Sequence, residues 1–161
     1  MPAADTSLLD IRSFLAIQRK ERYKAFIVHS PPEKDAERRR FLARLAALEN
    51  GVNVDVLARV AADPTLSGTV DLLDAAFLRQ IALDAAGSAE LVAIEEFDFL
   101  VPVWGGDLSA LKQMVDILSR TDTPSIIVFG MQTRPALEAW PLLNDQGQSR
   151  VLSLSAFQSL L

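Results

Sequence analysis

The sequence predicts an α/β fold built on a parallel, doubly wound sheet. Two nearly continuous apolar runs, Phe97 to Trp104 and Ser125 to Gly130, have the composition of strands that are covered on both faces. Between them, Gly105 and Gly106 permit a sharp reversal, and apolar residues recur at helical spacing from Leu108 to Leu118. A strand, a helix and a second strand in so short a stretch form a right-handed βαβ unit, the building block of an open parallel sheet.

Composition limits the class of protein. The chain has 161 residues, 50% of them hydrophobic and 23% charged, which fits one ordinary globular domain. No apolar run approaches the roughly 18 residues of a membrane span, so we expect a cytoplasmic protein with no membrane partner. The absence of cysteine excludes disulfides and cysteine nucleophiles, and the single histidine, His29, excludes multi-histidine metal sites. We therefore expect no bound metal.

Charge is distributed unevenly along the chain, whose net charge is −5. Residues 1–60 carry 11 Lys and Arg against 8 acidic residues, and the remainder of the chain is strongly acidic. The densest basic cluster is Arg38, Arg39 and Arg40 with Arg44, but acidic residues are interleaved with it. It is interpreted as a solvated helix face, with contact to a polyanion or an acidic protein as the alternative, and nucleic acid is not an expected partner.

The remaining elements follow from periodicity and turn residues. Helices are expected over residues 5–22, 30–50, 69–85 and 134–143, and strands over 24–30, 52–56, 97–104, 125–130 and 150–155. A loop is expected over 61–68, a helical turn from Leu91 to Ile94, and a truncated helix over 156–161. The chain thus divides into an N-terminal helix, 1–22, and a single α/β domain, 23–161, either complete or part of a longer chain.

Five strands with these connections predict a three-layer sheet in the order 2-1-3-4-5. In such sheets ligands bind at the carboxyl ends of the strands. The residues expected at this rim are His29, Ser30, Trp104, Gly105, Gly106, Asp107, Gly130 and Thr133.

The segment after the first strand argues against a phosphate-binding loop. Ser30-Pro31-Pro32-Glu33 has the pattern of a capping box, with Ser30 as the N-cap of the next helix. The two prolines remove backbone N–H donors, and Glu33 occupies the positive end of the helix dipole. We therefore expect no nucleotide cofactor.

Individual residues at the rim have competing interpretations. His29 is either a hydrogen-bonded rim histidine or a general base, and Trp104 is either a lid over the sheet or a platform for a planar ligand. Asp107 is interpreted as an N-cap. Glu95, Glu96 and Asp98 precede the predicted third strand, so they are assigned to a solvated surface on the side opposite the rim.

Three resemblances to known families are visible. The turn Pro102 to Gly106, before a helix that carries Lys112 and Asp116, resembles the flavodoxin and flavin-reductase pattern in which such a turn holds the isoalloxazine ring. This resemblance implies a flavodoxin-like fold and, as one alternative, an oxidoreductase that binds FMN or a nucleotide.

The same span, followed by Thr123 to Gly130, resembles a response-regulator receiver domain. Receivers carry acids after the first strand, a phosphoacceptor aspartate after the third, a hydroxyl residue after the fourth and a lysine after the fifth. The corresponding residues here are His29-Ser30, Val103-Trp104, Gly130 and Ser155, so the resemblance is to a pseudo-receiver.

The third resemblance is to TIR-like and nucleoside-hydrolysing domains, through Phe26 to Ser30 and Glu95 to Val103. Their catalytic glutamate lies on the helix after the central strand, where this chain has Asp116. A ribosyl-bond hydrolase is therefore a further alternative.

The leading expectation is a non-catalytic domain that acts in regulation or assembly through protein contacts. The N-terminal helix presents Leu8, Ile11 and Leu15 as an apolar stripe that must be covered. Either the domain itself or a second copy can cover it, and a homodimer is the expected assembly.

Overall fold

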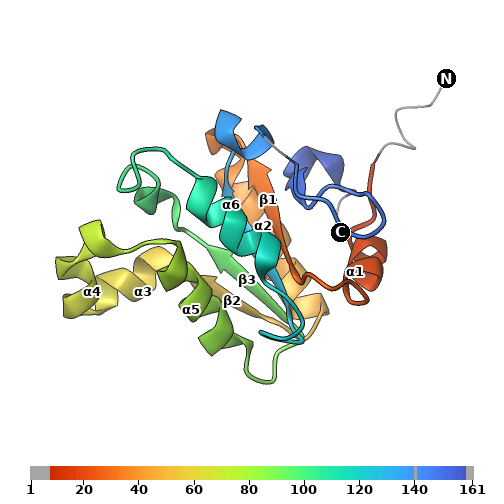
Figure 1. The fold of residues 1–161 in the computed structure, drawn as a ribbon, viewed down its shortest axis with the longest axis horizontal. Coiled ribbons are helices and arrows are strands. Elements are labelled where there is room, and N and C mark those ends of the chain that lie inside the picture. The colour runs from red at the N-terminus through yellow and green to blue at the C-terminus, as the bar shows by residue number, and fades with distance from the viewer. Residues whose placement is uncertain (1–7, 140, 159–161) are drawn as a thin grey trace.

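The computed structural model describes residues 8–139 and 141–158, which are organised around a five-stranded, entirely parallel sheet (Figure 1). The central strands β1, β3 and β4 are almost wholly buried, which the apolar run of β4 predicts. Strand β2 lies at one edge of the sheet, as predicted, and within it Val54 is buried whereas Val52 is 38% exposed. The strands are β1 (Ala25–Ser30), β2 (Val52–Asp55), β3 (Leu91–Glu95), β4 (Ile126–Gln132) and β5 (Val151–Ser153).

The predicted fold class, a three-layer α/β sheet of five parallel strands like that of flavodoxins, is confirmed. The strand neighbours are β2-β3-β4-β1-β5, so β1 lies between β4 and β5 and not beside β2. Helix α2 carries the chain from β1 past β4 and β3 to the edge. That path covers three strand spacings, roughly 14 Å, which a 14-residue helix spans easily. Apolar patterns identify strands but do not identify their neighbours.

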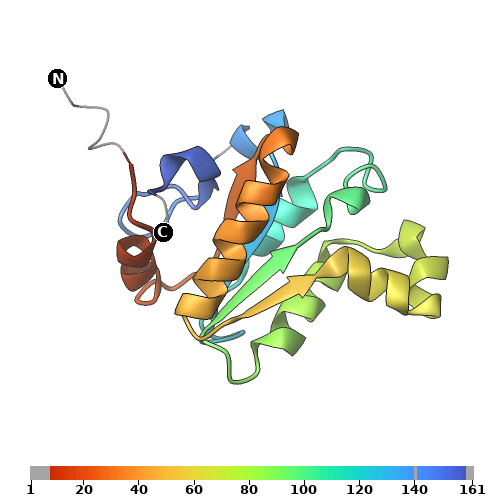
Figure 2. The ribbon, with the colours of Figure 1, turned by 180° about the vertical axis from the view of Figure 1, so that it is seen from behind.

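Helices cover both faces of the sheet. Helix α2 (Asp35–Leu48) lies on one face, with α1 (Ile11–Gln18) packed into the same core, whereas α5 (Ala75–Ala86) and α6 (Ser109–Ile117) cover the other face (Figures 1 and 2). Helices α3 (Val56–Ala62) and α4 (Pro64–Gly68) extend beyond the β2 edge (Figure 1). Short 3₁₀ turns are η2 (Pro32–Lys34), η3 (Val70–Leu72), η4 (Asp98–Leu100), η5 (Pro135–Glu138) and η6 (Leu154–Ala156).

The third strand lies earlier in the chain than the sequence predicts. It is Leu91–Glu95, which we expected to be a helical turn, whereas the run from Phe97 to Trp104 forms η4 and further turns. Two apolar runs stand side by side in the sequence, and only the first pairs with β2 and β4. The backbone of Glu96 has φ 63°, a left-handed conformation that ends the extended chain before the second run.

Several connections also differ from expectation. The predicted loop 61–68 is largely helical in α3 and α4, since Asp55 caps α3 and Asp63 caps α4 through backbone N–H groups. The helix predicted over 69–85 is interrupted and restarts at Ala75, where Asp74 is the N-cap. Among the described residues, the helix predicted over 134–143 is only the turn η5. Of the truncated helix predicted over 156–161, Ala156 ends η6, Phe157 and Gln158 are not helical, and residues 159–161 lie outside the described part.

The apolar stripe of the N-terminal helix is covered by the chain itself. Ile11 and Leu15 are fully buried on the α2 side of the sheet, and the Phe14 ring packs edge-on against Phe26 with centroids 5.1 Å apart. Leu8 is 41% exposed, and residues 5–7 of the predicted helix lie outside the described residues. The fold therefore does not need a second copy to shield Ile11 and Leu15.

Over residues 8–139 and 141–158, no helix is long and apolar enough to cross a membrane.

Candidate functional site

A buried polar cluster lies at the carboxyl ends of the central strands. We call it the carboxyl-edge cluster, and its members are Ser30, Asp35, Arg38, Glu95, Asp98 and Gln132. They come from the ends of β1, β3 and β4, from the first turns of α2 and from η4. This is the edge at which open α/β sheets bind ligands.

Arg38 is the centre of the cluster and its side chain is only 1% exposed. Its Nη1 donates to Ser30 Oγ at 3.0 Å and to Asp35 Oδ1 at 2.9 Å. Its Nε and Nη2 face the Glu95 carboxylate at 3.3 to 3.4 Å. Arg38 stands four residues before Leu42 and seven before Leu45, so the helix aims all three side chains at the sheet.

Glu95 ends β3 and reaches across β4. A Cβ built on Gly130 would overlap the Glu95 carboxylate and lie 2.5 Å from Leu42 Cδ1. Glycine is therefore required in the middle of β4 so that the carboxylate can lie against the strand and meet Arg38. Gly130 accordingly serves the packing of Glu95 and does not stand at the rim.

Two further carboxylates complete the network. Asp35 Oδ2 accepts from Gln132 Nε2 at 2.8 Å, and Asp98 Oδ1 accepts from the Gln132 backbone N–H at 2.9 Å. Arg134 Nη2 lies 3.8 Å from the same Asp98 oxygen. Together these bonds tie the ends of β1 and β4 to α2 and η4.

Burial sets the electrostatics of the cluster. It raises the pKa of Glu95 to about 7, although the Arg38 charge opposes the change. Burial also raises the pKa of Asp98, against the Gln132 N–H bond that favours the carboxylate. Burial lowers the pKa of Arg38, but the neighbouring Glu95 and Asp35 carboxylates raise it by more. The pKa of Arg38 is therefore above its ordinary value. The guanidinium therefore stays charged while Glu95 titrates near neutral pH.

Three of the residues predicted at the rim, His29, Ser30 and Thr133, meet at the ends of β1 and β4. His29 Nδ1 lies 2.8 Å from Thr133 Oγ1, and the Thr133 N–H donates to the Ser30 carbonyl at 2.8 Å. Gly130 lies two residues before the end of β4. Burial lowers the pKa of His29. These contacts fit a hydrogen-bonded rim histidine, one of its two predicted roles.

The predicted turn from Trp104 to Asp107 lies apart from this group. Trp104 Nε1 donates to the Leu73 carbonyl at 2.8 Å, and its half-buried ring packs against the core under α5 and α6. Gly105 and Gly106 have φ 68° and 79°, as a sharp reversal requires. Asp107 Oδ1 accepts from the Ser109 N–H at 2.8 Å at the start of α6. The turn is thus held by its own hydrogen bonds.

Two interpretations of the sequence were wrong. Ser30 does not cap α2, because it ends β1, receives the Arg38 hydrogen bond and is followed by η2, whereas α2 begins at Asp35. Glu95 is not on a solvated surface, since it is 2% exposed and stands at the carboxyl end of β3. The second error follows from placing the third strand one apolar run too late.

Sequence reasoning missed Arg38 and Glu95, although both carry a readable signal. Arg38 shares a helical face with Leu42 and Leu45, and Glu95 ends the run Leu91 to Ile94, which has the length and branched residues of a buried strand.

Space beside the cluster is small. A cavity of about 90 Å³ opens between Asp35, Arg38 and Asp98, with Leu57, Glu96, Phe99 and Gln132 completing its wall. Pockets for small-molecule ligands are about 300–1,000 Å³, so this cavity holds a few waters and not a nucleotide. Within the described part of the chain, no group of three His, Cys, Asp or Glu side chains could hold a metal ion.

No protein-family model, curated protein or solved structure matches the chain.

Proposed function

We propose that this chain is a non-catalytic domain of the pseudo-receiver or flavodoxin-like kind, which acts in regulation or assembly through contacts with other proteins. One observation carries the proposal: side chains of this chain already occupy the edge of the sheet at the ends of β3 and β4, and the cavity beside them is about 90 Å³. Arg38 is engaged by Ser30, Asp35 and Glu95, and all four come from the elements that would surround a ligand.

The loop after β1 supports the same conclusion. Pro31 and Pro32 offer no backbone N–H, and the Lys34 N–H donates to the Pro31 carbonyl within η2. A phosphate group placed there would find few donors and would approach Glu33 and Asp35. We propose that the chain carries no FMN, FAD or nicotinamide cofactor.

The receiver resemblance can be restated with the observed strand ends. Glu95 follows the third strand and Thr133 the fourth, in the places of the phosphoacceptor and the hydroxyl residue. His29-Ser30 replaces the acids after β1, and Ser153 to Ser155 stands where a receiver has lysine. Glu95 is already paired with Arg38, so a phosphoryl group has no free carboxylate to join. This supports a pseudo-receiver acting by contact.

A direct test is to titrate the protein with FMN, NAD and Mg-ATP, and with beryllofluoride and Mg²⁺, by calorimetry and tryptophan fluorescence. We expect no binding tighter than millimolar. Quenching of flavin fluorescence at micromolar protein, or a metal-dependent shift in tryptophan emission, would overturn the proposal.

A second candidate, a ribosyl-bond hydrolase, is favoured by Glu95 alone. A buried glutamate whose pKa is raised to about 7 is suited to proton transfer at neutral pH. Its contacts with Arg38 and its position against Gly130 leave it no open approach, which favours the structural role. Nicotinamide release from NAD that is abolished in Glu95→Gln would establish the hydrolase instead.

A further inference from the structure

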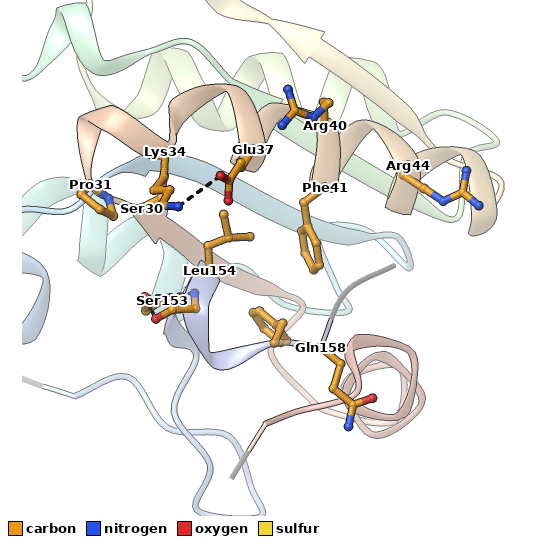
Figure 3. A pocket seen from close by; sticks show the side chains of 12 residues that line it. Ser30, Pro31, Lys34, Glu37, Arg40, Phe41, Arg44, Ser153, Leu154 and Gln158 are labelled. Atoms are coloured by element: carbon orange, nitrogen blue, oxygen red, sulfur yellow. Dashed lines mark hydrogen bonds and ion pairs between the residues drawn. The ribbon is translucent and has the colours of Figure 1, made fainter. Parts of the chain in front are cut away.

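A groove of about 620 Å³ lies between α2 and residues 153–158, which comprise the end of β5, η6 and the two residues after it (Figure 3). It is several times larger than the cavity at the carboxyl-edge cluster and is open along one side of α2. The residues that matter for its chemistry are Lys34, Arg40, Phe41, Arg44, Leu154 and Phe157.

The floor of the groove is apolar. The rings of Phe41 and Phe157 stack with centroids 5.6 Å apart and an interplanar angle of 29°. Leu154 is partly buried and packs against the same core, which includes the fully buried Leu42 and Leu45. Figure 3 shows Phe41 and Leu154 directed into the space between α2 and η6. An apolar side chain can therefore be seated there without rearranging the core.

The α2 wall of the groove is basic. Lys34, Arg40 and Arg44 line it together with one acid, Glu37, which pairs with Lys34 at 3.2 Å. Both members of that pair are half exposed, so the pair is weak and can exchange partners. The chain as a whole has a net charge of −5, so this wall concentrates positive charge on an acidic protein.

The dimensions of the wall favour an extended segment. Lys34 and Arg44 are ten positions apart, which is about 15 Å along a helix. An extended peptide of about four or five residues covers that distance. A compact inorganic anion could reach Arg40 and Arg44, which are four positions apart on α2, but it would not span from them to Lys34 and would leave the apolar floor exposed.

We propose that this groove binds an extended, acidic segment of a partner protein, with one aromatic or large aliphatic side chain seated on Phe41 and Leu154. The inference rests on the proposed function, because it names the surface through which a non-catalytic domain makes contact. Carboxylates facing Lys34, Arg40 and Arg44 guide association, and the apolar seat supplies most of the affinity.

The test is selection from a random heptapeptide library displayed on phage, using the full chain as bait. We expect the selected peptides to be enriched in Asp and Glu around a Phe, Trp, Tyr or Leu. The best peptide is then synthesised with a fluorescein label, and its Kd is measured by fluorescence polarisation at two salt concentrations. We expect binding to weaken at the higher salt.

Variants locate the binding. Arg40→Glu should weaken the peptide at least tenfold at unchanged melting temperature. Leu154→Ser should weaken it at least fivefold, and circular dichroism at the assay temperature verifies that this variant is folded. Arg59→Glu is the matched control. It reverses the same charge, and Arg59 is exposed on α3 away from the groove. It should change Kd less than twofold.

Four outcomes would overturn the inference. They are selection of basic or neutral peptides or of none, equal effects of Arg40→Glu and Arg59→Glu, competition by millimolar phosphate alone, and a tenfold gain in affinity on removing residues 1–7. Concentration-dependent dimerisation that Arg40→Glu abolishes would likewise assign the groove to a second copy. None of these results bears on flavin or nucleotide binding, so the proposed function stands or falls separately.

Discussion

Removing Arg38 while leaving Glu95 in place should be the most damaging single change at the carboxyl-edge cluster. Arg38→Met keeps the helix propensity and most of the side-chain volume but removes the charge. The side chain of Glu95 is 3% exposed, and Arg38 is the only cation within hydrogen-bond reach of it in the described structure. At pH 8 the substitution therefore leaves the Glu95 carboxylate without a counter-charge, and the Ser30 hydroxyl loses the hydrogen bond from Arg38. Breaking one partner of a buried ion pair costs about 3–5 kcal/mol.

The cost should depend on pH and on Glu95. Burial raises the pKa of Glu95 to about 7, so at pH 5 this carboxyl is neutral and needs no counter-charge. At pH 5 we expect Arg38→Met to cost about 1–2 kcal/mol, because it still removes the hydrogen bonds from Arg38 to Ser30 and Asp35. At pH 8 the double variant Arg38→Met/Glu95→Met should cost about 2–3 kcal/mol less than the sum of the two single variants. The reason is that the double variant removes both charges of the pair and leaves neither of them unpaired.

Urea unfolding followed by circular dichroism at pH 5 and pH 8 measures these free energies. Arg40→Met, on the exposed side of the same helix, is the control and should stay within about 0.5 kcal/mol of the parent. The reasoning fails if Arg38→Met costs less than about 1 kcal/mol at pH 8, or if its cost is the same at both pH values.

Three further predictions concern stability. Burial raises the pKa of Glu95 from 4.5 to about 7, so between these pH values the folded state binds more protons than the unfolded state. The free energy of unfolding should therefore fall by about 3 kcal/mol as pH rises from 4.5 to 7. The difference between the parent and Glu95→Gln isolates this contribution, and a difference independent of pH would contradict it. Gly130→Ala should cost about 1–3 kcal/mol in urea unfolding, because its Cβ meets the Glu95 carboxylate, and a neutral result would mean that Glu95 does not lie against β4. Leu15→Ala should cost about 2–5 kcal/mol and Leu8→Ala less than about 0.5, since only Leu15 is buried; equal costs would show that α1 does not dock as described.

The class of fold was readable from local patterns. The buried runs at Ala25–Ser30 and Ile126–Gln132, the alternation at Val52–Asp55 and the glycine turn at Gly105-Gly106 each report the physics of a few neighbouring residues. The prolines after β1 likewise exclude backbone donors whatever surrounds them. These features can be predicted without the tertiary packing of the chain.

The choice between adjacent apolar runs was decided by tertiary structure. Leu91 to Ile94 and Phe97 to Val103 are both apolar, and only pairing with β2 and β4 selects the first as a strand. That choice moves Glu95 from a presumed surface to the buried end of β3. The predicted site residues changed with it, since Trp104 to Asp107 lost their place beside His29 and Ser30.

The candidate site itself depended on strand order. Arg38 and Glu95 are 57 residues apart, and they meet because α2 crosses behind β4 while Gly130 leaves room for a carboxylate against that strand. Such contacts depend on which strands are neighbours and on the space that Gly130 leaves because it has no side chain. Local periodicity in the sequence encodes neither of these. By itself, the sequence determined an α/β sheet whose first strand is followed by two prolines; the tertiary structure decided that a buried ion pair occupies the end of β3, because only the folded chain brings Arg38 and Glu95 together.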